Sequence, residues 1–122
     1  MEDAITAIVG DAPVLDRGAL ERVQRIGGER LVQRMIGAFL EHVPARVDAL
    51  VAAGDGNDAG RTAHAIKSSA GNLGLERLRL LAQEVEARAE LGDESWSELR
   101  GHFAQAMGEA RAALEQQMER SS

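Results

Sequence analysis

Apolar residues recur at intervals of three and four along almost the whole chain after residue 15. This spacing places them on one face of an α-helix, whereas a half-buried strand would alternate apolar and polar residues. No window of the sequence shows such an alternation over a strand's length. The pattern therefore predicts an all-α protein.

The first predicted helix is short and runs through Leu20 and Val23. Asp16 is a residue type that caps helix N-termini, and Gly27 and Gly28 are expected to end the helix. A longer helix begins near Glu29, and Pro44 should kink it or divide it because proline lacks the backbone N–H. The apolar line of this longer helix is Leu31, Met35, Phe39, Val43, Val47 and Leu50.

Three further helices follow a predicted turn over residues 54–57. Asp58 is expected to cap the third helix, and Gly74 to end it in the left-handed conformation that glycine tolerates. A fourth helix stops at Gly92, and a fifth runs from about Asp93 to Met118. The apolar line of the third helix is Ala59, Ala63, Ile66, Ala70 and Leu73; that of the fourth is Leu75, Leu78, Leu81, Ala82, Val85 and Ala89; and that of the fifth is Trp96, Leu99, Phe103, Ala106, Ala110, Leu114 and Met118.

Short connections make consecutive helices antiparallel neighbours. The predicted fold is an up-and-down antiparallel four-helix bundle over residues 15–120, with a short N-terminal capping helix. Residues 1–14 form an N-terminal segment that can add a short helical turn around Ile5 to Val9.

The composition argues against several classes of protein. A chain of 122 residues is one domain, and the absence of cysteine excludes disulfides and thiol chemistry, which fits the cytoplasm. No apolar run approaches the roughly 20 residues of a membrane span, and the acidic N-terminus does not resemble a signal peptide. A net charge of −6 and 2% aromatic residues disfavour a nucleic-acid partner.

The three histidines do not predict a metal site. His42, His64 and His102 are far apart in sequence, and none of them is followed three or four residues later by a carboxylate. His42 and His102 are interpreted as surface or boundary residues.

His64 differs because of its neighbours on the third helix. Gly60, Lys67, Ser68 and Gly71 share with it the flank opposite the apolar line. Glycine in an exposed helix interior costs about 1 kcal/mol relative to alanine, so this small flank calls for an explanation. It is either an ordinary solvated face whose glycines pack against another helix, or a surface that another protein approaches closely.

The chemistry that suits this flank is phosphoryl transfer. A neutral imidazole is a competent nucleophile near pH 7, and Lys67 is one turn from His64, where an ammonium can neutralise phosphoryl charge. The flank contains no carboxylate to hold the Mg²⁺ that this chemistry usually requires, so the acidic pocket is expected in the partner.

Residues 63–75 resemble the signature of histidine-containing phosphotransfer (Hpt) domains. That signature has a histidine, an apolar residue two positions later, a lysine three later, small residues next and a glycine ten later. The matching positions are His64, Ile66, Lys67, Ser68, Ser69 and Gly74. Ser68 departs from the glycine that the family most often has, and the small serine is expected to affect docking only modestly.

The resemblance implies that a phospho-aspartyl receiver domain phosphorylates His64 on Nε2 and that His64 passes the group to an aspartate of a second receiver. Lys67 would stabilise the phosphoryl group, and Gly60, Ser68 and Gly71 would make room for the partner.

The same resemblance points to the following helix, where Gln83 and Glu86 are candidates for hydrogen bonds to the imidazole, although both also fit plain solvated positions. The expected partners are receiver domains of response regulators and hybrid histidine kinases. The chain itself would be a monomeric phosphocarrier, without kinase activity or a cofactor of its own.

Three alternatives remain at this point. The phosphoacceptor domain of a histidine kinase is disfavoured, because an acidic residue directly follows its histidine and Ala65 stands here. The phosphoacceptor domain of a chemotaxis kinase shares the motif and stays open. A helical interaction module that is never phosphorylated is the third alternative, and the presence of His64 argues against it.

Overall fold

The computed structural model describes residues 4–121, and these residues form helices joined by short connections, with no strand among them. The prediction of an all-α fold is confirmed. In chain order the elements are α1 (Ala4–Asp11), α2 (Arg17–Val51), α3 (Gly56–Leu73), α4 (Glu76–Glu90), a 3₁₀ helix η1 (Glu94–Leu99) and α5 (Arg100–Ser121).

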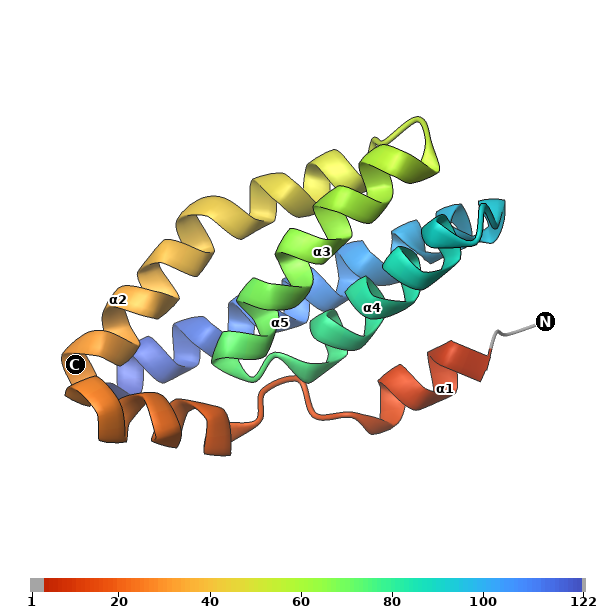
Figure 1. Cartoon of the computed structure of the whole chain (residues 1–122). Helices are drawn as coiled ribbons and strands as arrows, with labels where there is room; N and C mark the ends of the chain where they lie inside the picture. The colour runs from red at the N-terminus through yellow and green to blue at the C-terminus, as the bar shows by residue number, and fades with distance from the viewer. Residues whose placement is uncertain (1–3, 122) are drawn as a thin grey trace.

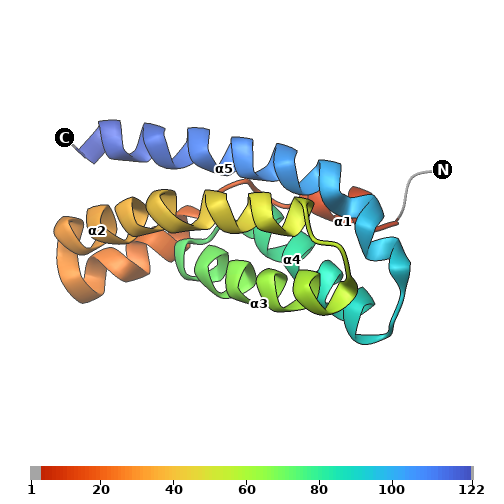
Figure 2. The same cartoon turned by 90° about the horizontal axis from the view of Figure 1, so that it is seen from above.

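Each of the four long helices packs against two others. The helix α3 contacts α2 and α4, whereas α5 contacts the opposite sides of the same two helices, and α1 packs against α4 (Figure 1). Viewed from above, α3 and α5 lie on opposite sides of the molecule (Figure 2). One long face of α3 is consequently left uncovered.

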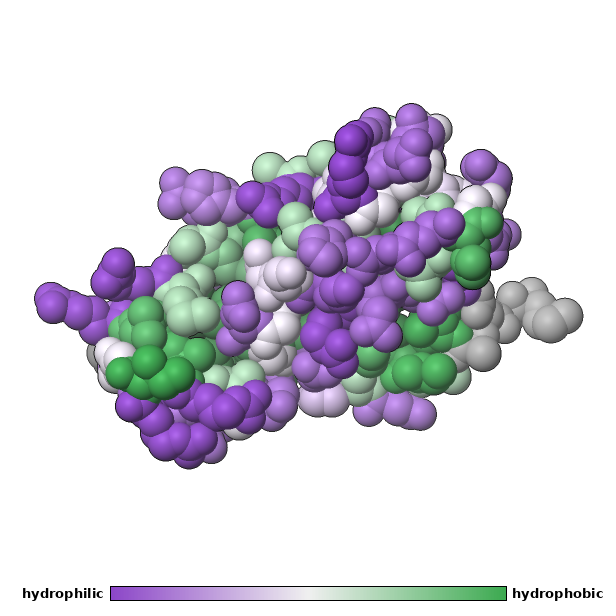
Figure 3. Space-filling view, in the orientation of Figure 1, coloured by the Kyte–Doolittle hydropathy of each residue, from purple (hydrophilic) through white to green (hydrophobic). Residues whose placement is uncertain are grey.

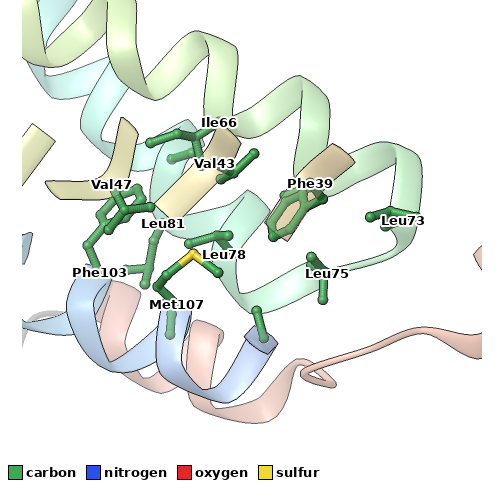
Figure 4. Packing of buried hydrophobic residues seen from close by; sticks show 14 of the residues in the cluster. Phe39, Val43, Val47, Ile66, Leu73, Leu75, Leu78, Leu81, Phe103 and Met107 are labelled. Atoms are coloured by element: carbon green, nitrogen blue, oxygen red, sulfur yellow. The ribbon is translucent and has the colours of Figure 1, made fainter. Parts of the chain in front are cut away.

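The core fixes the rotation of each helix about its axis. Phe39, Val43 and Val47 from α2 belong to the same buried cluster as Ile66 of α3 (Figure 4). The other two helices add the labelled residues Leu78, Leu81, Phe103 and Met107. Ile66 is completely buried, and burial of such a side chain contributes about 1.5–3 kcal/mol. Rotation of α3 would expose its apolar line, so the opposite flank is held toward solvent.

The helix α2 changes direction at Gly28, where φ is 74° and ψ is −175°. Residues 17–27 thereby form a separate short helical segment, as predicted from the glycine pair. Asp16 caps this segment, and its side chain accepts a hydrogen bond from the Gly18 N–H at 3.0 Å. The prediction that Asp16 is an N-cap is confirmed.

Pro44 does not divide α2. Non-helical backbone angles occur within this helix only at Gly28, although Pro44 lies well inside it. The packing of Val43 and Val47 on the core keeps the helix continuous across a missing backbone hydrogen bond. Of the two outcomes expected at Pro44, a kink or a division, the division is therefore wrong.

Two predicted helix starts are also corrected. The N-cap of α3 is Asp55, whose side chain accepts from the Asp58 N–H at 2.9 Å, so Asp58 lies in the first turn instead of capping it. After Asp93, the chain forms the 3₁₀ helix η1 before α5 begins at Arg100. The N-cap of η1 is Asp93, which accepts from the Ser95 N–H at 2.9 Å.

The end of α3 is locked to the start of α2. Gly74 adopts φ 75° and ψ 25°, the left-handed C-cap predicted for it. Its carbonyl accepts from the Asp16 N–H at 2.7 Å, and a Cβ at Gly74 would lie 2.6 Å from the Cβ of Ala19. Glycine is required here by both the positive φ and the close approach.

The only tryptophan of the chain anchors η1. Trp96 is 2% exposed, and the Arg100 guanidinium lies 4.8 Å from the centre of its ring. Arg100 also donates to the carbonyl of Ala53 at 2.8 Å, which joins η1 and α5 to the connection before α3. The indole Nε1 is buried, has no hydrogen-bond partner among residues 4–121, and lies 3.5 Å from where a Cβ of Gly56 would be.

Candidate functional site

The outward flank of α3 carries His64. The five apolar residues predicted to face the core are all buried, as expected. A helix turns by about 100° per residue, which directs His64 to the side opposite Ile66, and its side chain is 63% exposed. Hydrophilic residues cover much of α3 and α4 in the space-filling view, and strongly apolar patches lie toward the two ends of this face (Figure 3).

The predicted row around His64 divides into two parts. Ser68 and Gly71 are exposed beside the histidine, whereas Gly60 and Lys67 are partly covered. A Cβ at Gly60 would lie 3.2 Å from the Cβ of Ala89 in α4. The alternative in which a glycine serves helix packing therefore applies to Gly60, because it allows α3 and α4 to approach closely.

One carboxylate joins the histidine to the lysine. Glu86 reaches from α4, and its Oε2 lies 2.5 Å from the Nδ1 of His64. Its Oε1 accepts from the Nζ of Lys67, also at 2.5 Å. The Glu86 side chain is only 17% exposed and the Lys67 side chain 30%, so both groups lie in the seam between the two helices.

These contacts lower the pKa of Glu86 below the ordinary value. The hydrogen bond from Lys67 is the largest cause, burial opposes it, and the hydrogen bond to His64 adds to the lowering. An ionised carboxylate can only accept hydrogen bonds, so the Nδ1 of His64 carries the proton that it donates. In the neutral ring the lone pair is then on Nε2, which is the nitrogen directed away from this contact.

Gln83, the other candidate on α4, bonds elsewhere. Its Oε1 accepts from the Nη1 of Arg79 at 3.3 Å, and Glu76 binds the same guanidinium through both carboxylate oxygens. The hydrogen bond with Glu76 raises the pKa of Arg79. Of the two residues predicted near the imidazole, the structure brings Glu86 into contact with it.

The two other histidines lie apart from this cluster. His42 on α2 is 64% exposed and lies near Glu41, and His102 on α5 is exposed at the edge of a crevice beside α1. Within residues 4–121, no group of three or more His, Cys, Asp or Glu side chains could hold a metal ion.

A sequence comparison with known families identifies the chain. The Hpt domain matches residues 34–121, which include His64, Lys67 and Glu86. The chain belongs to the Hpt domain family. Comparisons with curated proteins and with solved structures give no match.

Membership of the Hpt family defines a general activity. Hpt domains take part in histidine phosphotransfer within phosphorelays, as phosphocarrier modules and not as kinases, and they interact with receiver domains. The matched region of this Hpt domain begins inside α2, after the break at Gly28. Among the helices that the structure describes, none is long and apolar enough to cross a membrane.

Proposed function

We propose that this Hpt domain carries a phosphoryl group on the Nε2 of His64, which it takes from the phospho-aspartate of one receiver domain and gives to the aspartate of another. The observation that carries the proposal is the hydrogen bond between Glu86 and Nδ1, since it leaves the lone pair on Nε2, the nitrogen that Glu86 does not bind. The 63% exposure of the His64 side chain supports the approach of a partner active site.

The transfer step balances as an in-line displacement. The Nε2 lone pair forms a bond to phosphorus while the bond from phosphorus to the aspartyl oxygen breaks, and the aspartate leaves as a carboxylate. Because Nδ1 keeps its proton, the phosphorylated ring carries positive charge, which the adjacent Glu86 carboxylate stabilises. Attack by the aspartate of a second receiver reverses these bond changes and returns the neutral ring.

In this proposal the ammonium of Lys67 neutralises negative charge on the phosphoryl group. Its ammonium lies one helical turn from His64 and is held by Glu86 in the unphosphorylated state. Phosphoryl oxygens on Nε2 would offer it a second set of acceptors, and charge-assisted bonds of this kind are stronger than neutral ones. Exposed Ser68 and Gly71 leave space beside the ring. The Mg²⁺ that this chemistry usually needs is assigned to the receiver domain.

Two further parts of the proposal concern the whole chain. We assign it the up-and-down antiparallel four-helix bundle, supported by the contacts of α2 and α4 with both α3 and α5. A monomeric state and a cytoplasmic location stay predictions from the sequence.

The test uses a phosphorylated receiver domain with Mg²⁺. The wild-type chain should become labelled, and the bond should be labile in acid and stable in alkali, as a phosphohistidine is. His64→Gln should accept no label. Equal labelling of His64→Gln and wild type would refute the mechanism, and transfer from a kinase's ATP alone, with no transfer from any receiver, would favour the chemotaxis-type alternative.

A further inference from the structure

A groove follows the seam between α3 and α4 and ends at the imidazole. The first half of α3 and the second half of α4 form its two walls, and His64 and Glu86 close its inner end. The remaining lining includes Gly56, Asn57, Gly60, Ala89 and Glu90. A partner that covers the Nε2 of His64 is therefore in direct reach of this groove.

The floor of the groove is apolar and close to the backbone. Gly56 and Gly60 have no side chains, and their Cβ positions would lie 3.8 and 3.2 Å from the Cβ of Ala89. The space measures about 360 Å³, which is near the lower limit for small-molecule pockets and open to solvent. These dimensions suit one long side chain of a docked protein.

The charges at the rim are compensated except at one position. Arg61 pairs with Asp58 on its own helix, and Glu86 pairs with Lys67. Glu90 is exposed and forms no ion pair or hydrogen bond with any residue in the described range 4–121. A carboxylate beside an apolar floor complements a cation on an aliphatic stem.

We infer that this groove receives a lysine or arginine side chain of the receiver domain. The aliphatic stem lies over Ala89 and the two glycines, and the charged end pairs with Glu90. This inference rests on the proposed function, because it names the contact that places the receiver's aspartate on His64. Charge pairs at the edge of an interface chiefly determine partner choice and association rate, so Glu90 is a specificity-determining residue.

The first experiment reverses the charge of Glu90. Transfer from a phosphorylated receiver domain that labels the wild type is measured against the concentration of the Hpt domain, for Glu90→Lys and for Glu98→Lys, a matched change at an exposed position outside the groove. Glu90→Lys should need at least a tenfold higher concentration for half-maximal rate, with its maximal rate nearly unchanged and a weaker salt dependence. Equal behaviour of the two variants would overturn the inference.

A second pair of variants tests whether the groove must be empty for the receiver domain to dock. Asn57→Phe places a bulky ring in the groove from an exposed position, and Ala112→Phe adds the same ring on α5. Asn57→Phe should slow transfer from the receiver at least tenfold, whereas Ala112→Phe should not. Loss of transfer in Asn57→Phe with no effect of Glu90→Lys would indicate an apolar occupant and overturn the assignment of a basic one.

Phosphoramidate separates failure of docking from failure of the chemistry. This small phosphoryl donor needs no docking surface, so it should phosphorylate the wild type, Glu90→Lys and Asn57→Phe at equal rates. A slower reaction of these variants with phosphoramidate would overturn the inference, because the groove would then act through the imidazole. Labelling by phosphoramidate without transfer from any receiver would overturn the proposed function as well.

Discussion

Glu86 of α4 holds the ring of His64 on α3, with its Oε2 2.5 Å from Nδ1. The proposed nucleophile and the carboxylate bonded to it thus come from different helices, and the close contact of α3 with α4 at Gly60 and Ala89 keeps them together. In this arrangement the packing of two helices determines which ring nitrogen is engaged by Glu86 and which one the proposed function leaves for the phosphoryl group.

Replacement of Glu86 by glutamine should slow phosphotransfer. Hydrogen bonds to charged groups contribute about 1.5–3 kcal/mol, which corresponds to a loss of roughly 10- to 100-fold in rate. The ¹⁵N chemical shifts of His64 should also show a smaller population of the Nδ1–H tautomer. The control is Glu84→Gln on the same helix, where the carboxylate pairs with Arg88 and not with His64. Transfer by Glu86→Gln at the wild-type rate would contradict the role of Glu86.

Removal of the Lys67 ammonium should affect transfer far more than folding. Lys67→Ala loses the cation beside the phosphoryl group, with an expected decrease of about 10- to 100-fold in transfer rate. The free energy of unfolding should change by only about 1 kcal/mol, because the Lys67 side chain is 30% exposed and water partly screens its ion pair with Glu86. Arg111→Ala, which removes an exposed cation from α5, should change neither quantity. Parallel losses of rate and stability in Lys67→Ala would count against its assigned role.

The lowered pKa of Glu86 predicts a contribution to stability that depends on pH. Its interactions with Lys67 and His64 stabilise the fold fully above the ordinary glutamate pKa of 4.5. As the pH falls below 4.5, the unfolded chain binds this proton before the folded chain does, and the contribution is lost as the pH passes the lowered pKa. Urea unfolding from pH 7 to pH 3 should therefore show a difference between wild type and Glu86→Gln that shrinks in acid. A constant difference would contradict the pKa direction.

Gly74→Ala should destabilise the fold through the junction of α3 with α2. The positive φ is strained for alanine, and its Cβ would lie 2.6 Å from the Asp16 carbonyl oxygen. A cost of about 1–3 kcal/mol is expected in the free energy of unfolding. In Gly108→Ala, by contrast, the new Cβ has no neighbour within 4 Å in a helix, so a gain of about 0.5–1 kcal/mol is expected. Denaturant unfolding of both variants decides whether strain or helix propensity dominates at each site.

The sequence predicted α3 better than α2, for a physical reason. In α3 the apolar line is narrow and bordered by polar residues, so its five members could be assigned to the core without a structure. In α2 apolar residues lie on both sides of the line, and Val32 and Ile36 are buried where Leu31 and Met35 were expected. Leu31 and Met35 lie at the edge of the buried stripe and are half covered.

Contacts between helices were harder to predict from the sequence than the face that each helix buries. Periodicity indicates that His64 and Lys67 point outward, but the partner of each depends on the register of α4 against α3. That register follows from the approach of Ala89 to Gly60, which no local pattern reveals. For this reason Gln83 and Glu86 were equivalent candidates from the sequence, and only the structure separates them.

The buried tryptophan of η1 gives this protein an optical reporter. The chain has one tryptophan and no tyrosine, so its near-ultraviolet emission comes almost entirely from Trp96. The indole Nε1 lies against Gly56, which lines the groove next to His64. Occupation of that groove would change the surroundings of a single fluorophore, and docking could be followed in solution without any attached dye.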